Sequence, residues 1–298
     1  MRVSCVIPTR GRVDRLEVCL ASIRGQRLPE APEIIVVEDA ADPPVGWLGA
    51  DVRRIRFESP VGACVARNRA VAEATGDLLL LCDDDAELID SETIRKAAAW
   101  FERRPGLAAV AFRQLGSERE DHYFQAARSE VACLCGMFFS FACMVRRSAW
   151  ETVGGMNEQF GYYFEEIELS LKFHVAGYEI LYDPGIAAVH HEDKRDRDWG
   201  RIHRQTTRNA LLTYLVHYPG YVLPLFFYRR LRMYARLMNR RFFPAGGDLR
   251  WLWRELRSRR GYVRRARRPM PWKQVRAWHG LCNRPVPLVV GSKAEDVG

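Results

Sequence analysis

Short runs of apolar residues recur through the first third of the chain. Residues 3–7, 34–37 and 78–81 are almost wholly apolar. Runs of this length without alternating polar positions are typical of strands buried on both faces of a parallel sheet. Between the first two runs, residues 13–24 place leucine and isoleucine at helical spacing. The order strand, helix, strand predicts a right-handed βαβ unit, so we expect an α/β fold.

Similar patterns continue downstream. A short strand around Ile55 precedes a helix over 62–74, which begins at a glycine and ends before Gly76. Strands are then expected at 108–112, 136–145, 178–182 and 186–191, and a helix at 165–176. Asp183-Pro184-Gly185 is expected to connect the last two strands. Because the carboxyl ends of strands in open α/β sheets form the ligand-binding edge, polar residues that follow the runs become candidates for a site.

Charge divides the chain into two regions. The net charge is +9, yet residues 1–228 hold 27 basic and 33 acidic side chains. Residues 229–284 hold 18 Lys or Arg and only two acids. An acidic body is therefore joined to a cationic tail, and we expect the two regions to serve different functions.

The cysteines and the N-terminus bear on the cellular compartment. Eight cysteines are scattered along the chain, and none forms the CxxC pairs of a structural zinc site. Cys133-Leu134-Cys135 is favoured as a pair of small buried hydrophobes, with a redox or metal element as the alternative. The N-terminus runs at once into the first apolar segment, which is too short and strand-like for a signal peptide. We expect a cytoplasmic protein with reduced thiols.

Three consecutive aspartates, Asp83, Asp84 and Asp85, follow the apolar run at 78–81. Their charges repel one another at close range, so a divalent cation is the simplest partner. Mg²⁺ or Mn²⁺ is commonly held by one or two carboxylates while substrate phosphates supply other ligands. A solvated acidic turn is the alternative that the triplet alone leaves open.

A series of motifs in a fixed order carries a resemblance to a known family. The first four are Val6-Ile7-Pro8-Thr9, Val36-Val37-Glu38-Asp39, the segment 62–68 and Leu81-Cys82-Asp83-Asp84-Asp85. Gly154-Gly155-Met156-Asn157-Glu158 and the acidic box at 163–169 follow, and a strand from Gly177 leads to His190. Together they resemble family 2 glycosyltransferases. The resemblance implies a GT-A fold, a mixed and mostly parallel sheet flanked by helices, over residues 1–209, with a basic, aromatic-rich helical region over 210–298.

The resemblance also implies roles for individual positions in binding a nucleoside-diphosphate sugar and a divalent metal. Nucleotide-sugar-binding roles fall on Pro8, Thr9, Arg10, Glu38, Asp39, Arg67, Asp83 and Asp84. Metal-binding roles fall on Asp85, Asp83 and His190, with Mn²⁺ or Mg²⁺ as the ion. The aspartate triplet leaves open which carboxylate contacts the metal, and His191 beside His190 leaves a similar ambiguity.

The acidic box implies the catalytic base. Glu166 matches the general base of the family, where the residue is usually aspartate, and Glu165 is the second choice. Glu168 is expected to pair with Lys172 one helical turn later. The implied reaction is an inverting single displacement in which the base removes a proton from an acceptor hydroxyl.

The C-terminal region allows several interpretations. Residues 211–228 contain no Lys, Arg, Asp or Glu, but Pro219, Gly220 and Pro224 make a membrane-spanning helix improbable. An interfacial segment on an anionic membrane and a helical hairpin closing over the first domain both remain open. A homodimer contact is a further role for this region, and the tail favours a lipid-linked or cell-envelope acceptor.

Two other functions are compatible with parts of the sequence. Arginines interleaved with tryptophans could bind nucleic acid, but no RNA- or DNA-binding motif accompanies them and the acidic body repels a polyanion. A sugar nucleotidyltransferase would also use an α/β fold with metal carboxylates, and Arg10 and Arg12 after the first strand fit its basic loop. Such an enzyme would usually carry a glycine-rich loop there.

Overall fold

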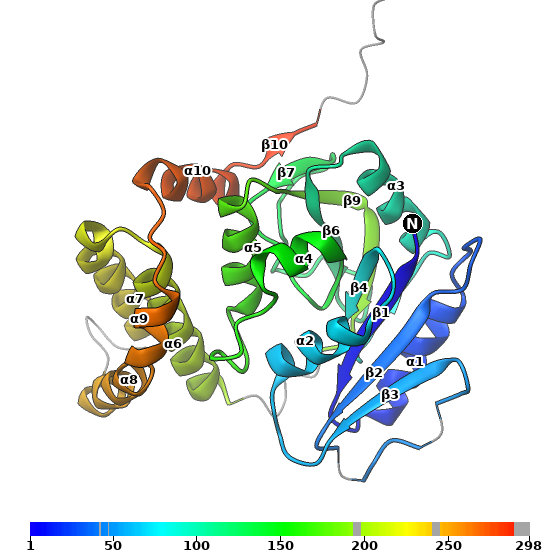
Figure 1. The fold of residues 1–298 in the computed structure, drawn as a ribbon, viewed down its shortest axis with the longest axis horizontal. Helices are drawn as coiled ribbons and strands as arrows, with labels where there is room; N and C mark the ends of the chain where they lie inside the picture. Colours follow the sequence, from blue (N-terminus) through cyan, green and yellow to red (C-terminus); the bar gives the residue numbers. More distant parts are fainter. Residues whose placement is uncertain (42, 47, 193–197, 240–244, 289–298) are drawn as a thin grey trace, which may run out of the picture.

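The protein is described here by a computed structural model that covers residues 1–41, 43–46, 48–192, 198–239 and 245–288. Its strands are β1 (Val3–Thr9), β2 (Glu33–Asp39), β3 (Val52–Phe57), β4 (Leu78–Cys82), β5 (Ala86–Leu88), β6 (Leu107–Leu115), β7 (Cys133–Cys135), β8 (Ala142–Arg146), β9 (Glu179–His190) and β10 (Val286–Pro287). They form one sheet in the order β10-β7-β9-β6-β8-β4-β1-β2-β3, and β5 pairs with β9 (Figure 1). β3, β2, β1 and β4 are parallel, and β6 and β9 run in the same direction because β8 lies antiparallel between β4 and β6. The predicted mixed, mostly parallel sheet is confirmed.

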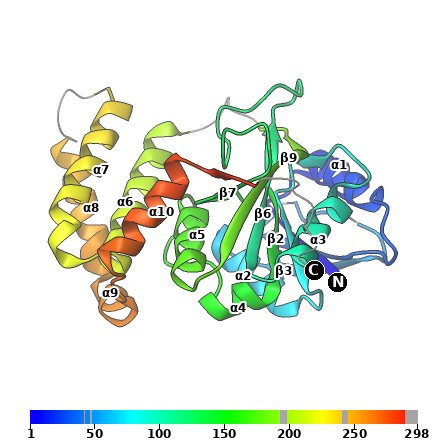
Figure 2. The same cartoon turned by 90° about the horizontal axis from the view of Figure 1, so that it is seen from above.

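Helices cover both faces of this sheet (Figure 2). They are α1 (Val13–Arg24), α2 (Ala63–Glu73), α3 (Thr93–Arg103), α4 (Arg147–Val153) and α5 (Glu165–Val175). Side chains of α1 and α3 pack with alternate residues of the strands on one face, including Cys5 and Ile7. Side chains of α2, α4 and α5 pack with the other set, including Val6. The wholly apolar runs of the sequence follow from this burial on both faces.

The C-terminal region is helical and packs against α5. It consists of α6 (Trp199–His217), the 3₁₀ turn η1 (Gly220–Val222), α7 (Leu223–Leu237), α8 (Gly246–Ser258), α9 (Arg260–Ala266) and α10 (Trp272–Asn283). A third apolar cluster joins Leu171 of α5 to Tyr218, Phe226 and Trp278. Within the described residues, no helix combines the length and apolar character needed to cross a bilayer. Residues 289–298 of the expected C-terminal region lie outside the described residues.

Several boundaries differ from the expectation. The expected division at residue 209 falls inside α6, which runs unbroken from Trp199 to His217. Residues 136–141 are not a strand, and β8 begins only at Ala142. Asp183-Pro184-Gly185 does not separate two strands, because β9 continues through it with a register shift against β6. Strand pairing along β6 supplies hydrogen bonds on either side of the shift, and local turn chemistry cannot reveal that support.

Candidate active site

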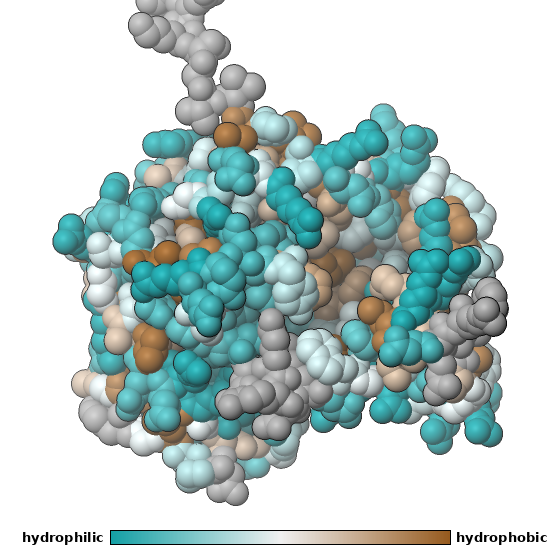
Figure 3. All heavy atoms as spheres, turned by 180° about the vertical axis from the view of Figure 1, so that it is seen from behind, coloured by the Kyte–Doolittle hydropathy of each residue, from teal (hydrophilic) through white to brown (hydrophobic). Residues whose placement is uncertain are grey.

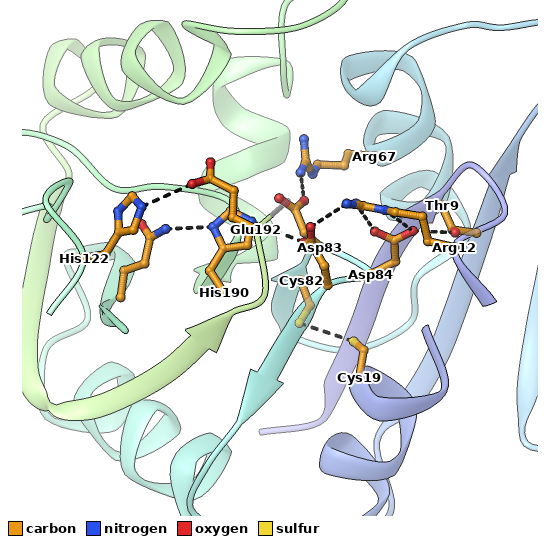
Figure 4. A network of polar contacts seen from close by, with 12 residues as sticks. Thr9, Arg12, Cys19, Arg67, Cys82, Asp83, Asp84, His122, His190 and Glu192 are labelled. Carbon is orange, nitrogen blue, oxygen red and sulfur yellow. Dashed lines mark hydrogen bonds and ion pairs between the residues drawn. The ribbon is translucent and has the colours of Figure 1, made fainter. Parts of the chain in front are cut away.

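Two aspartates and one histidine from distant strands meet at the carboxyl edge of the sheet. Asp83 and Asp85 follow β4, and His190 is the last residue of β9. Ligand atoms of all three lie within 4.8 Å of one another. Figure 4 shows Asp83 and His190 approaching each other from the two strands. The structure therefore brings together the three residues predicted to hold a metal.

The chemistry of this cluster fits a divalent cation. Asp85 Oδ1 is buried and makes no hydrogen bond to any described residue, and His190 Nε2 lies 3.2 Å from it. Burial would raise the pKa of Asp85, but the interaction with His190 and the charge of Arg12 outweigh burial and lower that pKa. Asp85 is thus ionised and has a lone pair without a hydrogen-bond donor. Two carboxylates with one imidazole form a ligand set suited to Mn²⁺ or Mg²⁺.

His190, not His191, belongs to this cluster. His190 Nδ1 lies 2.7 Å from Gln114 Nε2 on β6, a contact that fixes the ring plane. The His190 ring also stacks on Phe141. His191 Nε2 instead lies 2.7 Å from Glu87 Oε2, away from the aspartates. A ring held through its second nitrogen is the usual arrangement for a metal-binding histidine.

Asp84 lies apart from the cluster. Its carboxylate accepts a hydrogen bond from Thr9 Oγ1 (2.6 Å) and another from Arg12 Nε (3.3 Å). Arg12 also donates from Nη1 to Asp85 Oδ2 at 2.5 Å, so its guanidinium spans two of the three aspartates. Burial raises the pKa of Asp84 to about 6, although Arg12 and Thr9 oppose that shift. The structure thus places Asp83 and Asp85 beside His190, whereas Asp84 is turned toward Thr9 of β1.

Arg67 connects the aspartates with the acidic box. Its side chain is only 2% exposed, donates from Nη2 to Asp83 Oδ1 at 2.5 Å, and places Nη1 3.8 Å from Glu165 Oε1. Burial and the charge of Glu166 raise the pKa of Glu165 well above its usual range, although Arg67 opposes the shift. Arg67 was predicted to support the nucleotide. The structure places it beneath the site, where its charge holds Asp83 and the start of α5 together.

Glu166 differs from Glu165 in its surroundings. Glu165 is buried beside Arg67, whereas Glu166 is partly exposed. Glu166 Oε1 accepts a hydrogen bond from Ser140 Oγ at 3.0 Å and a longer one from Ser140 N at 3.4 Å. Those bonds fix the direction of the carboxylate and leave Oε2 for another partner. A general base needs such access to its substrate, and of the two glutamates only Glu166 has it.

A strained turn precedes these glutamates. Tyr163 and Phe164 have φ angles of 67° and 74°, a region that bulky L-residues seldom occupy. Asn209 on α6 stabilises the turn by donating from Nδ2 to the carbonyls of Tyr162 (2.9 Å) and Tyr163 (2.6 Å). Arg208 donates to the carbonyl of Phe160 at 2.7 Å. The C-terminal region therefore holds the backbone that positions Glu165 and Glu166.

The remaining predicted nucleotide-site residues lie at the ends of β1 and β2. Thr9 and Glu38 are partners in the parallel register, and Pro8 is partly exposed one residue earlier. Glu38 is fully buried, where it accepts from Arg54 Nε at 2.9 Å and from Val45 N at 3.2 Å. Both carboxylate oxygens of Glu38 thus accept hydrogen bonds from other groups of the protein.

Asp39 and Arg10 occupy contrasting environments near the same edge. Asp39 is buried and accepts from the backbone N–H groups of Val61 (2.6 Å) and Gly62 (3.1 Å), which orders the loop before α2. Gly62 has a φ of +85°, and a Cβ there would lie 2.9 Å from the carbonyl oxygen of Gly161, so the close approach requires glycine. Arg10 is exposed, and Arg12 rather than Arg10 contacts the aspartates.

Sequence reasoning did not identify Gln114, Ser140 or Asn209 as site residues. Gln114 and Ser140 contact site residues 76 and 26 positions away, and Asn209 reaches a turn 46 positions away. The only local signal is for Ser140, a polar residue between phenylalanines, because Gln114 and Asn209 each follow an arginine. Because one sequence does not reveal which distant segments meet, that signal could not assign them to the site.

Replacing Asn209 by Ala should slow the reaction without abolishing binding at the sheet edge. The change leaves the carbonyls of Tyr162 and Tyr163, in a partly buried turn, without their side-chain donor, a loss of about 0.5–1.5 kcal/mol for each hydrogen bond. We expect kcat to fall at least about tenfold as the strained backbone relaxes and Glu166 shifts, with a smaller change in donor KM. Steady-state kinetics on the purified full chain would measure both.

Thr213→Val is the matched control for that variant. Thr213 is also buried on α6, and its Oγ1 donates to the carbonyl of Asn209 at 2.9 Å without touching the turn. It should lose some stability but keep kcat. Equal losses of kcat in both variants would show that Asn209 acts only through the stability of α6.

Comparison with known proteins gives consistent results. A family model described as "Glycosyl transferase family 2" matches residues 4–163. The chain is 28% identical over 223 residues to the pre-mycofactocin glycosyltransferase of Mycobacterium tuberculosis, which covers 66% of this chain and 44% of that protein. The chain spans less than half the length of the curated relatives it matches.

Two solved structures share its fold. The mannosyltransferase PcManGT from Pyrobaculum calidifontis, in complex with GDP-Man and Mn²⁺, superimposes with a TM-score of 0.56 at 16% identity, covering 95% of this chain and 86% of that one. TarS 1-349 from S. aureus, in complex with UDP-GlcNAc, gives a TM-score of 0.56 at 14% identity, covering 79% of this chain and 73% of that one. At such identities the similarity concerns the fold alone.

Proposed function

The chain belongs to glycosyltransferase family 2, and from this membership we propose that it is an inverting, metal-dependent enzyme that transfers a sugar from a nucleoside diphosphate to an acceptor hydroxyl. Asp83, Asp85 and His190 hold the metal in this proposal. Glu166 is the general base. The contacts of Arg67 with Asp83 and Glu165 support assigning both roles to one site.

One observation carries the proposal. Arg67 contacts Asp83 with one nitrogen and approaches Glu165 with another, so a single guanidinium spans the distance from the metal-site cluster to the residue before Glu166. A partly exposed carboxylate thus lies close to a cation site, which is the arrangement needed for proton removal beside a departing diphosphate. An acidic turn formed only for solubility would not require a buried arginine between the two groups.

Each step falls to a residue of this chain. Glu166 takes the proton from the acceptor hydroxyl, whose oxygen then forms a bond to the anomeric carbon as the bond to the diphosphate breaks. Ser140 orients Glu166 for this transfer. A bound divalent ion would offset the negative charge that develops on the leaving diphosphate. Arg12 contacts Asp84 and Asp85, and Arg67 contacts Asp83, so the two guanidinium groups offset the repulsion among the three carboxylates.

We propose the donor and the acceptor only as chemical classes. The two structural neighbours bind GDP-Man and UDP-GlcNAc respectively, so the shared fold accommodates either base. We propose a nucleoside-diphosphate sugar as donor, and a lipid-linked or cell-envelope acceptor reached from the cytoplasmic side. The basic C-terminal region supports that acceptor class.

Thermal-shift measurements with UDP, GDP or dTDP and Mn²⁺ or Mg²⁺ test the proposal. The matching nucleoside diphosphate with metal should raise Tm by about 5 °C at roughly 100 times its Kd. Omitting the metal should remove most of that shift. Turnover of the matching donor should release nucleoside diphosphate. Release of pyrophosphate would identify a nucleotidyltransferase instead, and no shift with any nucleotide would contradict the proposed donor class.

A further inference from the structure

One side of α7 exposes a row of large apolar side chains. Tyr221 just before the helix is 74% exposed, and along the helix Leu225 is 48% exposed and Leu237 is 49% exposed. Tyr228 and Met233 are similarly exposed between them. Tyr228 follows Leu225 by three residues and Leu237 follows Met233 by four, so these side chains are spread over the solvent-facing half of the helix. Large apolar residues normally scatter singly over a surface, so a row along one face indicates a contact surface.

Arginines share this face. Arg229, Arg232 and Arg236 are exposed at the same helical spacing as the apolar row. The helix from Leu223 to Leu237 contains no Asp or Glu, so no acid of α7 itself neutralises them. Arg232 donates to the hydroxyl of Tyr228 at 3.1 Å, which ties one cation to the apolar row. The outer side of α7 is therefore both apolar and strongly cationic.

α8 packs on α6, as α7 does, and exposes a similar mixture of side chains, although it contains Asp248 and Glu255. Trp253 is 64% exposed and Leu249 is exposed one turn earlier, among the exposed Arg250, Arg254 and Arg257. Glu255 of this helix is occupied by Arg208 and Arg259, at 3.0 and 2.8 Å. Figures 1 and 2 both place α7 and α8 at the end of the molecule remote from β1–β3. Figure 3 shows mixed hydrophilic and hydrophobic side chains over that end, seen from behind at the right.

The apolar run at residues 211–228 is divided between the exposed row, which takes Tyr221, Leu225 and Tyr228 from it, and a buried cluster. Tyr218 and Phe226 of that run are buried in the cluster against α5, and Arg230 is buried against Phe164, with its guanidinium 5.5 Å from the ring. α6 and α7 thus form a helical hairpin on the first domain, one of the two structures expected for residues 211–228. The exposed residues are left over from that packing, so the fold does not depend on them.

We propose that the outer face of α7 and α8 docks on an anionic membrane surface. A helix lying at the interface buries Leu, Met and Tyr at the acyl boundary while its arginines meet lipid phosphates. RNA would use the arginines and aromatic rings but gives no role to Leu225, Met233 or Leu237. A second copy docked through the same face in a two-fold dimer would oppose arginine to arginine. An anionic bilayer matches both features of the face.

Vesicle flotation of the full chain tests this surface. The protein should partition into vesicles of phosphatidylglycerol and phosphatidylcholine in equal parts, but little into phosphatidylcholine alone, and about 1 M salt should weaken partitioning. The triple variant Arg229→Ser, Arg232→Ser and Arg236→Ser should lose about fivefold for each arginine, or roughly 100-fold in all. Leu225→Ser with Leu237→Ser should lower partitioning with less dependence on salt.

A matched control removes the same charge elsewhere. Arg15, Arg27 and Arg103 are exposed on the sheet domain, and their triple Ser variant should partition like the unchanged chain. Equal loss in the control and the α7 variant would overturn the proposal, as would equal binding to neutral and anionic vesicles. RNA binding lost in the α7 variant without vesicle binding, or a dimer in light scattering that the variant abolishes, would assign the face to those partners instead.

Vesicle binding and the thermal shift with nucleotide test the membrane proposal and the proposed function separately. The α7 variant should keep the thermal shift with nucleoside diphosphate and metal, because none of its residues contacts the aspartate cluster or Glu166. Loss of vesicle binding with the nucleotide shift retained is the expected result. If nucleoside diphosphate with metal does not raise the Tm of the unchanged chain, the proposed function is contradicted. The proposed membrane-docking face is unaffected by that result.

Discussion

Replacing Glu166 by Gln should lower kcat by about 100- to 10,000-fold, the contribution usual for a positioned general base. The amide keeps the size of the side chain and can still bond to Ser140, so the site should remain assembled. It cannot accept the proton of the acceptor hydroxyl. Binding of nucleoside diphosphate with metal should be nearly unchanged, because in the proposed mechanism Glu166 contacts the acceptor hydroxyl and does not hold the nucleotide or the metal. Steady-state kinetics and the thermal shift together measure the two effects.

Glu165→Gln is the control that separates the two glutamates. The pKa of Glu165 is raised by burial and by Glu166, so a neutral amide resembles the state that its surroundings favour. We expect a modest change in kcat and some loss of stability from the weakened contact with Arg67. A larger loss in Glu165→Gln than in Glu166→Gln would reverse the assignment of the base. Loss of nucleotide binding in Glu166→Gln with turnover retained would exclude it as the base.

Replacing Asp85 by Asn should remove metal binding and with it most of the activity. The carboxylate is ionised, its Oδ1 has no hydrogen bond among the described residues, and its loss takes one of two anionic ligands from the cluster. Metal stabilisation of a developing charge is worth several kcal/mol, so a fall of about 1,000-fold in kcat is expected. Titration of Mn²⁺ followed by electron paramagnetic resonance would measure binding without reference to turnover.

Asp84→Asn provides the comparison for the metal. Its carboxylate is bonded to Thr9 and Arg12 rather than turned toward His190, so the variant should be less stable yet still bind Mn²⁺. EDTA should abolish activity in the unchanged chain, and added Mn²⁺ or Mg²⁺ should restore it. Activity that survives both EDTA and Asp85→Asn would remove the metal from the mechanism. Equal Mn²⁺ affinity in all three proteins would place the ion elsewhere.

The α/β core was largely readable from the sequence. The helix over 13–24 matches α1, and the apolar runs at 3–7, 34–37 and 78–81 lie within β1, β2 and β4. The signal for these elements lies within each segment. A run of four or five apolar residues is stable only where both faces of the strand are covered, so the run itself indicates a buried strand. The interval 136–141 was misread because a buried Phe, such as Phe138 against α5, serves equally well in a loop and in a strand. α3 and α4 were not predicted at all.

The site divides along the same line. The sequence by itself determined which candidate residues follow or begin elements whose ends meet at one edge, namely Asp83, Asp84, Asp85, Glu166 and His190. The order and direction of the strands bring these residues to that edge, whichever side chains they contact there. Only the tertiary structure decided which aspartate turns toward His190. Thr9 and Arg12 hold the Asp84 carboxylate on the other side, and they lie 75 and 72 positions from it in the sequence.

The two glutamates were distinguished in the same way. Burial of Glu165 against Arg67 and the bond from Ser140 to Glu166 depend on contacts across 98 and 26 positions. Local pattern fixes where a backbone segment lies, because periodicity records which face is buried. The direction and ionisation of a side chain depend on neighbours that arrive only when distant segments pack, so the contacts that support the proposed base and the proposed metal ligands became visible only in the folded chain.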